Sequence, residues 1–266
     1  MSGPVGIFDS GVGGLTVLKE LVRRLPHEEM IYLGDTARVP YGIRSPEVVT
    51  RYCMENTAFL LKAGIKLLVV ACNTASSLSL DALRAGFSIP MIGVLAPGAK
   101  AAVEASRGGR IGVIGTSGTI NSGAYAREIQ RLDPGAEVIS QACPLFVPLA
   151  EEGWVDDEVA DAVAARYLAP LREAGVDALV LGCTHYPLLK GAIRRVMGEE
   201  VVLIDSAVET ALEVERTLKQ EGIASAASRA GARRFCVTDI PDRFRVIGER
   251  FLGIELDKVE QVDVVH

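Results

Sequence analysis

Two segments of this chain place a cysteine at the same point of the same local pattern. The first, LLVVACNTA, carries Cys72, and the second, ALVLGCTHYP, carries Cys183. Each has an apolar run of strand length, then the cysteine, then small polar residues and a helical pattern. A strand-to-helix turn presents backbone N–H groups and positive dipole potential, a setting that lowers the pKa of a thiol. Two such turns predict chemistry in which two thiols face one substrate.

Apolar runs of strand length alternate with helical patterns along the whole chain. Their continuous Val/Ile/Leu character is typical of strands that are covered on both faces. Strands that alternate with helices predict an α/β fold with βαβ units and mainly parallel sheets, in which ligands bind beyond the carboxyl ends of the strands. The predicted strands are 5–8, 30–33, 67–71, 90–94, 110–114, 137–141, 178–181, 201–204, 234–237 and 260–264, and the predicted helices include 15–25, 46–63, 157–174 and 207–221.

An internal repeat organises these elements. Residues 5–17, VGIFDSGVGGLTV, resemble residues 111–123, IGVIGTSGTINSG: both have a strand, a polar pair and a glycine-bearing turn. Cys72 follows Ser10 by 62 residues, and Cys183 follows Thr116 by 67. The repeat predicts two similar lobes related by a pseudo-two-fold axis, with the active site in the cleft between them. We expect a discontinuous first lobe of residues 1–96 plus 207–266, because the tail returns to complete it, and a second lobe of residues 97–206.

Composition and charge exclude several classes of function. The net charge is −6 with no basic stripe, so nucleic acid is not an expected partner. The apolar runs fall short of the roughly 20 residues of a membrane span, so no membrane partner is expected. The five cysteines form no C-x-x-C pair, which argues against a metal ribbon or a dithiol motif. We expect a cytoplasmic chain with reduced thiols and no secretory signal.

The residues after the first strand suit a small charged ligand. Asp9 and Ser10 open the run GVGG, but the dinucleotide fingerprint fails because Thr16 occupies the position of its third glycine. A smaller anion or zwitterion bound by backbone N–H groups fits this turn better. Asp9 is a candidate to meet an ammonium group or to receive a proton, and a helix-capping aspartate is the alternative.

Other candidates lie beside the cysteines and in the loops. His185 lies two residues after Cys183, so an acid–base role is favoured over a structural histidine. A Cys–His pair is also found in cysteine hydrolases, but that interpretation leaves Cys72 unexplained. The turn Pro40-Tyr41-Gly42, the hydroxyls of Thr116 and Thr119, and the adjacent carboxylates of Glu151 and Glu152 are weaker candidates, for which a plain turn or a solvated helix end is the alternative.

Six motifs together resemble those of the glutamate racemases, within the aspartate/glutamate racemase superfamily. They are GIFDSGVGGLTVL, DTARVPYG, ACNTAS, GVIGTSGTI, CPLFVPLAEEG and GCTHYPLL, in the expected order, and the resemblance extends over nearly the whole chain. It implies interconversion of L- and D-glutamate without pyridoxal phosphate or metal, which supplies D-glutamate for peptidoglycan. It also implies two α/β lobes with the active site between them. The tail after about residue 207 carries no motif of its own.

The resemblance also assigns roles to residues. It implies that Cys72 and Cys183 are the two bases, with Asp9 and His185 as their proton-handling partners. Glu151 or Glu152 is implied to orient His185. The implied substrate-binding residues are Asp9, Ser10, Pro40, Tyr41, Gly42, Asn73, Thr74, Thr116, Thr119, Thr184 and His185. Two bases on opposite faces of the substrate explain why racemisation needs two cysteines.

Three alternatives stay open at this point. An aspartate racemase or another member of the superfamily, such as a hydantoin racemase, differs from a glutamate racemase by small changes in the pocket. A racemase scaffold with an additional protein-binding role is a second alternative. A cysteine hydrolase is the third, and it predicts one essential cysteine. The sequence leaves the oligomeric state open, a homodimer included.

Overall fold

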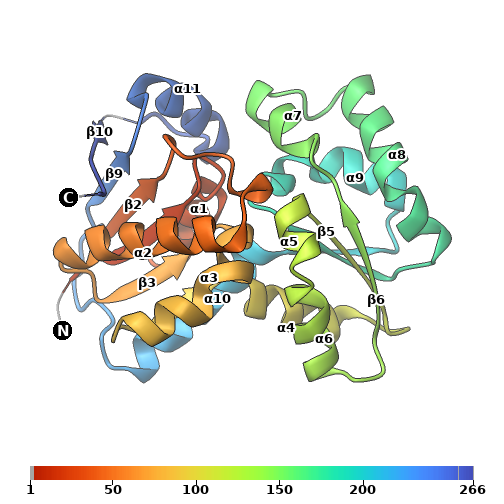
Figure 1. Cartoon of the computed structure of the whole chain (residues 1–266), viewed down its shortest axis with the longest axis horizontal. Coiled ribbons are helices and arrows are strands. Elements are labelled where there is room, and N and C mark those ends of the chain that lie inside the picture. The colour runs from red at the N-terminus through yellow and green to blue at the C-terminus, as the bar shows by residue number, and fades with distance from the viewer. Residues whose placement is uncertain (1–2, 257, 266) are drawn as a thin grey trace.

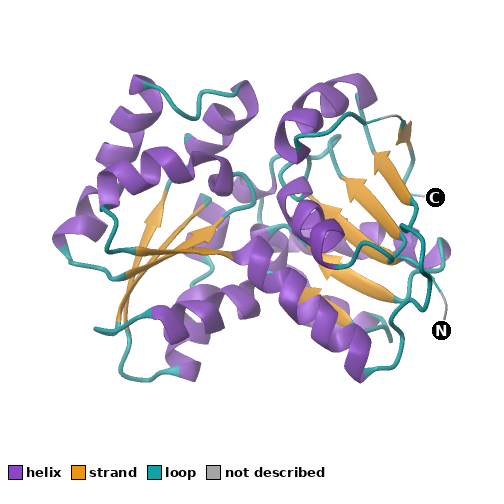
Figure 2. Ribbon diagram, turned by 180° about the vertical axis from the view of Figure 1, so that it is seen from behind, coloured by secondary structure: helices purple, strands orange, loops and turns teal. Residues whose placement is uncertain are grey.

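The chain folds into two parallel sheets that lie side by side, each flanked by helices (Figure 1). The structure is a computed structural model that describes residues 3–256 and 258–265. Figure 2 shows the same arrangement from behind, with helices packed against both sheets. The predicted α/β class with two lobes and parallel sheets is confirmed. Among the described residues, no helix is both long and apolar enough to cross a membrane.

The strands lie where the apolar runs predicted them. The first sheet has the order β10-β9-β2-β1-β3-β4 and the second has the order β6-β5-β7-β8. Their bounds are β1 Val5–Asp9, β2 Met30–Gly34, β3 Leu67–Val70, β4 Met91–Gly93, β5 Arg110–Gly115, β6 Glu137–Ala142, β7 Ala178–Gly182, β8 Val202–Asp205, β9 Arg233–Val237 and β10 Val259–Gln261. Only β10 departs from its predicted end by more than one residue: it ends at Gln261 instead of 264.

The helices connect these strands and cover their faces. Their bounds are α1 Leu15–Arg24, α2 Pro46–Lys62, α3 Asn73–Gly86, α4 Leu95–Ala105, α5 Ser117–Asn121, α6 Ala124–Leu132, α7 Phe146–Glu152, α8 Glu158–Glu173, α9 Lys190–Met197, α10 Ser206–Gln220 and α11 Pro241–Leu252, with short 3₁₀ helices at Tyr41–Ile43 and Tyr186–Leu189. Helix α10 contacts both α1 and α4, and therefore packs against elements that accompany both sheets.

The internal repeat of the sequence is a repeat of topology. The order β2-β1-β3-β4 in the first sheet is repeated as β6-β5-β7-β8 in the second. In each sheet the chain moves from the central strand to one side and then crosses to the other side. Such a switch of direction opens a crevice at the carboxyl ends of the central strands, where ligands of α/β proteins bind. Asp9 ends β1 and Cys72 follows β3, while Thr116 follows β5 and Cys183 follows β7.

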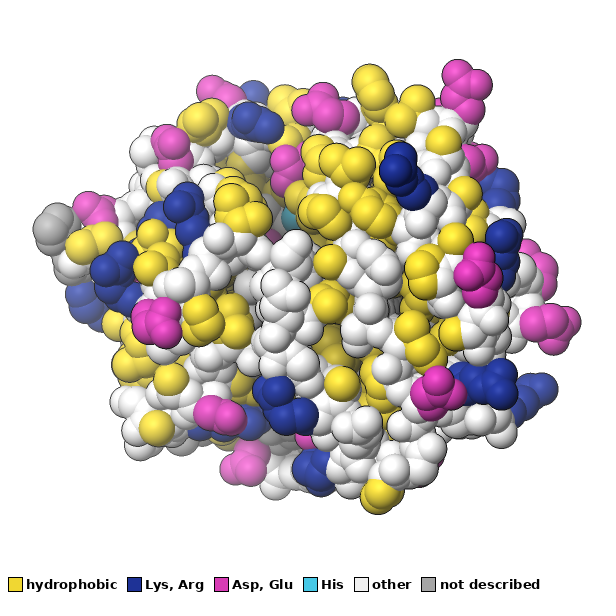
Figure 3. Space-filling view, turned by 45° about the vertical axis from the view of Figure 1, so that its right-hand side comes forward, with side chains coloured by type: hydrophobic (Ala, Val, Ile, Leu, Met, Phe, Trp, Pro, Cys, Tyr) yellow, Lys and Arg dark blue, Asp and Glu magenta, His cyan; other side chains and the backbone are white. Residues whose placement is uncertain are grey.

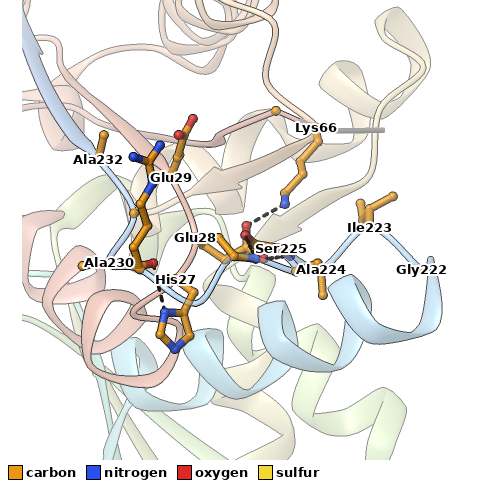
Figure 4. A pocket seen from close by; sticks show the side chains of 15 residues that line it. His27, Glu28, Glu29, Lys66, Gly222, Ile223, Ala224, Ser225, Ala230 and Ala232 are labelled. Carbon is orange, nitrogen blue, oxygen red and sulfur yellow. Dashed lines mark hydrogen bonds and ion pairs between the residues drawn. The ribbon is translucent and has the colours of Figure 1, made fainter.

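A buried ion pair lies at the other edge of the first sheet, near the amino ends of its strands (Figure 4). The segment 222–232, between α10 and β9, borders a cavity of about 670 Å³ there. Lys66 Nζ lies 2.6 Å from Glu28 Oε2, and both side chains are only 4% exposed. Glu28 Oε1 also accepts a hydrogen bond from Ser225 N at 2.6 Å, which ties the segment to the sheet. This pair is a structural feature far from the cysteine turns.

Replacing Lys66 by methionine is expected to lower the free energy of unfolding by about 3–5 kcal/mol, because Glu28 then lies buried without a counter-charge. Urea denaturation followed by circular dichroism measures it. The control is Glu128→Gln, which removes the exposed Glu128–Arg131 ion pair and is expected to cost less than about 1 kcal/mol. Equal losses in the two variants would contradict a strong dependence on the buried pair.

Candidate active site

The two cysteine turns lie at the carboxyl ends of strands from different sheets. Figure 3 shows the molecule hollowed between its two halves, with a histidine visible at the bottom of the hollow. Cys72 and Cys183 are each 6% exposed, so both thiols are largely shielded from solvent. The site is therefore built from the loops that follow β1 and β3 on one side and β5 and β7 on the other.

Cys72 forms the N-cap of α3. Its sulfur accepts a hydrogen bond from Ala75 N at 3.5 Å, which explains why the helix begins at the next residue. The thiol donates to Ser10 Oγ at 3.7 Å, so the glycine-bearing turn after β1 contacts the first cysteine directly. Asp9 is fully buried beside them, and its Oδ2 accepts from Gly11 N at 2.9 Å. Its Oδ1 has no hydrogen-bond partner among the described residues.

Burial dominates the electrostatics around Cys72. It raises the pKa of the Cys72 thiol to about 12, and the negative charge of Asp9 acts in the same direction. The Ala75 N–H and the Ser10 hydroxyl oppose this shift but are outweighed. The sequence predicted a lowered pKa for the thiol at this helix N-terminus, and for Cys72 that prediction is wrong because burial outweighs the N–H donor. Burial also raises the pKa of Asp9, against the opposing effects of His185 and of backbone N–H groups.

Cys183 has a different setting, because a histidine faces it. His185 Nδ1 lies 3.8 Å from the Cys183 sulfur, and His185 Nε2 lies 3.1 Å from Glu151 Oε1. Burial alone would lower the pKa of His185, but hydrogen bonds and charge interactions with Cys183 and Glu151 raise it to about 10. Burial raises the pKa of Glu151, yet His185 and Arg243 lower it more. Of the two adjacent glutamates, Glu151 is thus the one that contacts the histidine.

Three threonine hydroxyls meet between the cysteine turns. Thr74 Oγ1 lies 2.9 Å from Thr116 Oγ1 and 3.2 Å from Thr119 Oγ1, and these last two lie 3.1 Å apart. Thr74 follows β3 of the first sheet, whereas the other two follow β5 of the second. Gly42 also contacts this cluster, since a Cβ at its position would lie 2.7 Å from Thr116 Cβ. A glycine is therefore required where this loop approaches the second sheet.

The first glycine-bearing turn packs against the second cysteine turn. Thr16 Oγ1 donates to the carbonyl of Thr184 at 2.9 Å. A Cβ on Gly13 would lie 2.3 Å from Thr184 Oγ1 and 2.5 Å from the ring of His185. Only a glycine permits this approach, which explains the glycine at this position of the GVGG run.

Asn73, directly after Cys72 in the first cysteine turn, is buried. Its Oδ1 accepts a hydrogen bond from the hydroxyl of Tyr125 at 2.6 Å. Its Nδ2 has no hydrogen-bond partner among the described residues. The amide nitrogen therefore has N–H donors that are unpaired.

Tyr41 does not present its hydroxyl to the cleft. The hydroxyl donates to the buried carboxylate of Asp35 and accepts from Asn56 Nδ2 at 3.1 Å, inside the first half of the molecule. Pro40 is exposed on the same loop. A substrate contact from Tyr41 would therefore come from its backbone.

Helix α11 contributes residues that sequence reasoning missed. The ring of Phe251 packs edge-on against His185 with centroids 5.4 Å apart. Arg250 Nη1 donates to the Glu151 carbonyl at 2.6 Å, and Arg243 Nη2 lies 4.0 Å from Glu151 Oε2. The helix lies in the tail, which carries no motif, so no sequence signal pointed to these contacts.

The geometry defines a class of enzyme in which two thiols, each with its own titratable partner, meet in one cleft between two α/β lobes. Among the described residues, no group of three or more His, Cys, Asp or Glu side chains is arranged to hold a metal ion.

The chain belongs to the Asp/Glu/Hydantoin racemase family, whose model matches residues 8–214. It is 58% identical to the glutamate racemase of Geobacter metallireducens over 98% of this chain and 96% of that protein. The crystal structure of glutamate racemase isoform RacE1 from Bacillus anthracis has a TM-score of 0.94 at 44% identity and covers 98% of this chain and 97% of that one. The glutamate racemase of Francisella tularensis in complex with D-glutamate has a TM-score of 0.93 at 37% identity, covering 99% and 98%.

Proposed function

We propose that this protein interconverts L-glutamate and D-glutamate by a two-thiol mechanism without a cofactor, and that it supplies D-glutamate for peptidoglycan. The observation that carries the proposal is the presence of Cys72 and Cys183 in equivalent turns of two sheets with the same strand order. The relatives support glutamate as the substrate: the Geobacter protein is a glutamate racemase, and the Francisella enzyme was crystallised with D-glutamate.

The two settings suggest how the thiols divide the work. With its pKa raised to about 12 by burial, Cys72 holds a proton at rest. Cys183 faces His185, whose pKa of about 10 keeps the imidazole protonated at neutral pH, and a cation at 3.8 Å stabilises negative charge on the sulfur. In our proposal Cys183 takes the Cα proton of L-glutamate, and Cys72 gives its own proton to the opposite face. The enzyme then holds a Cys72 thiolate and a Cys183 thiol, which is the state that accepts D-glutamate.

Removing the proton requires the site to stabilise a carbanion-like transition state. Donors fixed in advance towards the α-carboxylate supply that stabilisation in a site that excludes water. The hydroxyls of Thr74, Thr116 and Thr119 are the groups that we propose for this role. The unpaired Asn73 Nδ2 is proposed to bind a carboxylate oxygen equally in the substrate and in the transition state. The unpaired Oδ1 of Asp9 is the acceptor that we propose for the ammonium group, or for a proton passed to Cys72.

We extend the proposal to the organisation of the molecule. A first lobe of residues 1–96 plus 207–266 and a second of 97–206 are supported by the pairing of β9 with β2. Reduced, unpaired cysteines support a cytoplasmic location. A homodimer is supported by two exposed apolar side chains: Val246 on α11, which is 59% exposed, and Trp154 just after α7, which is 53% exposed. A light-scattering mass equal to that of a single chain would contradict the homodimer.

The function is tested by circular dichroism of L- and D-glutamate, and of both aspartate enantiomers, with protein treated with EDTA. We expect each glutamate enantiomer to reach the racemate, and aspartate to react at least about tenfold more slowly, because one missing methylene misplaces the distal carboxylate. Faster turnover of aspartate would favour the aspartate racemase alternative. Loss of activity that only added metal restores would contradict the cofactor-free mechanism.

A further inference from the structure

One side chain outside the sequence-predicted site contacts both cysteine turns. Tyr125, on α6, is 2% exposed, and its hydroxyl donates to Oδ1 of Asn73, the residue directly after Cys72. Its ring also lies against Gly182, the residue directly before Cys183: a Cβ at position 182 would approach Tyr125 Cε2 to 3.3 Å. A single tyrosine therefore contacts both turns at once.

The hydrogen bonds of Tyr125 also fix the orientation of the Asn73 amide. Ser206 is hydrogen-bonded to the Tyr125 hydroxyl, and burial raises the pKa of that hydroxyl, so the phenol keeps its proton. With Ser206 on its oxygen, the phenol directs that proton at Asn73 Oδ1 and the Nδ2 end points the other way. Nδ2 is buried without a partner, and an unpaired buried donor costs about 1–3 kcal/mol. A ligand with an acceptor oxygen at this position removes that cost.

We propose that Tyr125 is a positioning residue, which holds the Asn73 amide so that Nδ2 donates to a carboxylate oxygen of the bound amino acid. Tyr125 follows β5 and Asn73 follows β3, so the amide is oriented only when the two halves of the molecule are together. This inference rests on the proposed function, since the ligand is the substrate of that site.

The first test is Tyr125→Phe, which keeps the ring and removes only the hydroxyl. We expect KM for both glutamate enantiomers to rise about tenfold while kcat changes by less than about threefold, since one neutral hydrogen bond is at stake. The matched control is Tyr167→Phe on α8, where the hydroxyl accepts from Leu145 N at 3.4 Å; its KM should not change. A fall in kcat with unchanged KM in Tyr125→Phe would reduce the residue to a structural support and overturn the proposal.

The second test is a double-mutant cycle with Asn73→Ala, which separates action through Asn73 from any other effect. If Tyr125 acts through the amide, Tyr125→Phe adds no further increase in KM once Asn73 is alanine. Equal increases with and without Asn73 would overturn the proposal. The wild-type protein in the same assay separates failure of the proposed function from failure of the positioning role. If the wild-type protein does not racemise glutamate, the proposed function is wrong. If it does, and the kinetics of Tyr125→Phe are unaltered, only the positioning role is wrong.

Discussion

Replacing either Cys72 or Cys183 by alanine is expected to lower racemisation about 10³-fold or more in both directions. A positioned acid–base group contributes roughly 10²–10⁴-fold, and here each direction uses one thiol to take a proton and the other to give one. The double variant should be no slower than the slower single variant, because groups that act on one path are not additive. Initial rates by circular dichroism, from each pure enantiomer, measure the effect.

The control is Cys236→Ala, the same change at a fully buried cysteine on β9. It should leave kcat near the wild-type value. Its unfolding midpoint shows how much of any effect comes from packing. The rates of the three single variants are compared at temperatures equally far below their unfolding midpoints. Near-normal turnover in Cys72→Ala or in Cys183→Ala would mean that one base suffices and would exclude the two-thiol path.

The strands were predictable because their signal is local. A continuous apolar run indicates a strand covered on both faces, whichever helices cover it. The strands β1, β3, β5 and β7 therefore lie within one residue of their predicted ends. The repeat of the glycine and cysteine turns predicted two similar halves, and the two sheets do share one strand order. Parallel strands carry their carboxyl ends to one edge, which is why turns far apart in sequence meet.

The electrostatics of the site was not predictable in the same way. A helix N-terminus is visible in the sequence and favours a thiolate at Cys72, but burial by the surrounding elements is not visible and it dominates. Tyr41 is a similar case. Its place in a turn favours a ligand contact, but in the structure its hydroxyl is hydrogen-bonded to Asp35 and Asn56. Tyr125 and helix α11 act through tertiary contacts alone, and no spacing in the chain marks them.

The partners of the cysteines are expected to show their roles as a difference between directions. Asp9→Asn should lower kcat most from D-glutamate to L-glutamate, and His185→Asn most from L to D, each by roughly 10²–10⁴-fold. Enantiomers have equal free energy, so kcat/KM stays equal in both directions and the asymmetry must be balanced in KM. Progress from each pure enantiomer separates kcat from KM. Equal and small losses in both directions would make Asp9 and His185 structural supports.

The same histidine should set the alkaline limit of activity. The pKa of His185 is raised to about 10, so its imidazolium is present at neutral pH and is lost as the pH rises through that value. Because the cation stabilises negative charge on Cys183, kcat of the wild-type protein, measured at saturating glutamate, is expected to fall above about pH 10. The Cys72 proton persists to about pH 12, so it does not cause this fall. In His185→Asn, whose amide does not titrate, the fall at pH 10 should disappear. A variant that keeps the wild-type alkaline limb would show that another group controls it.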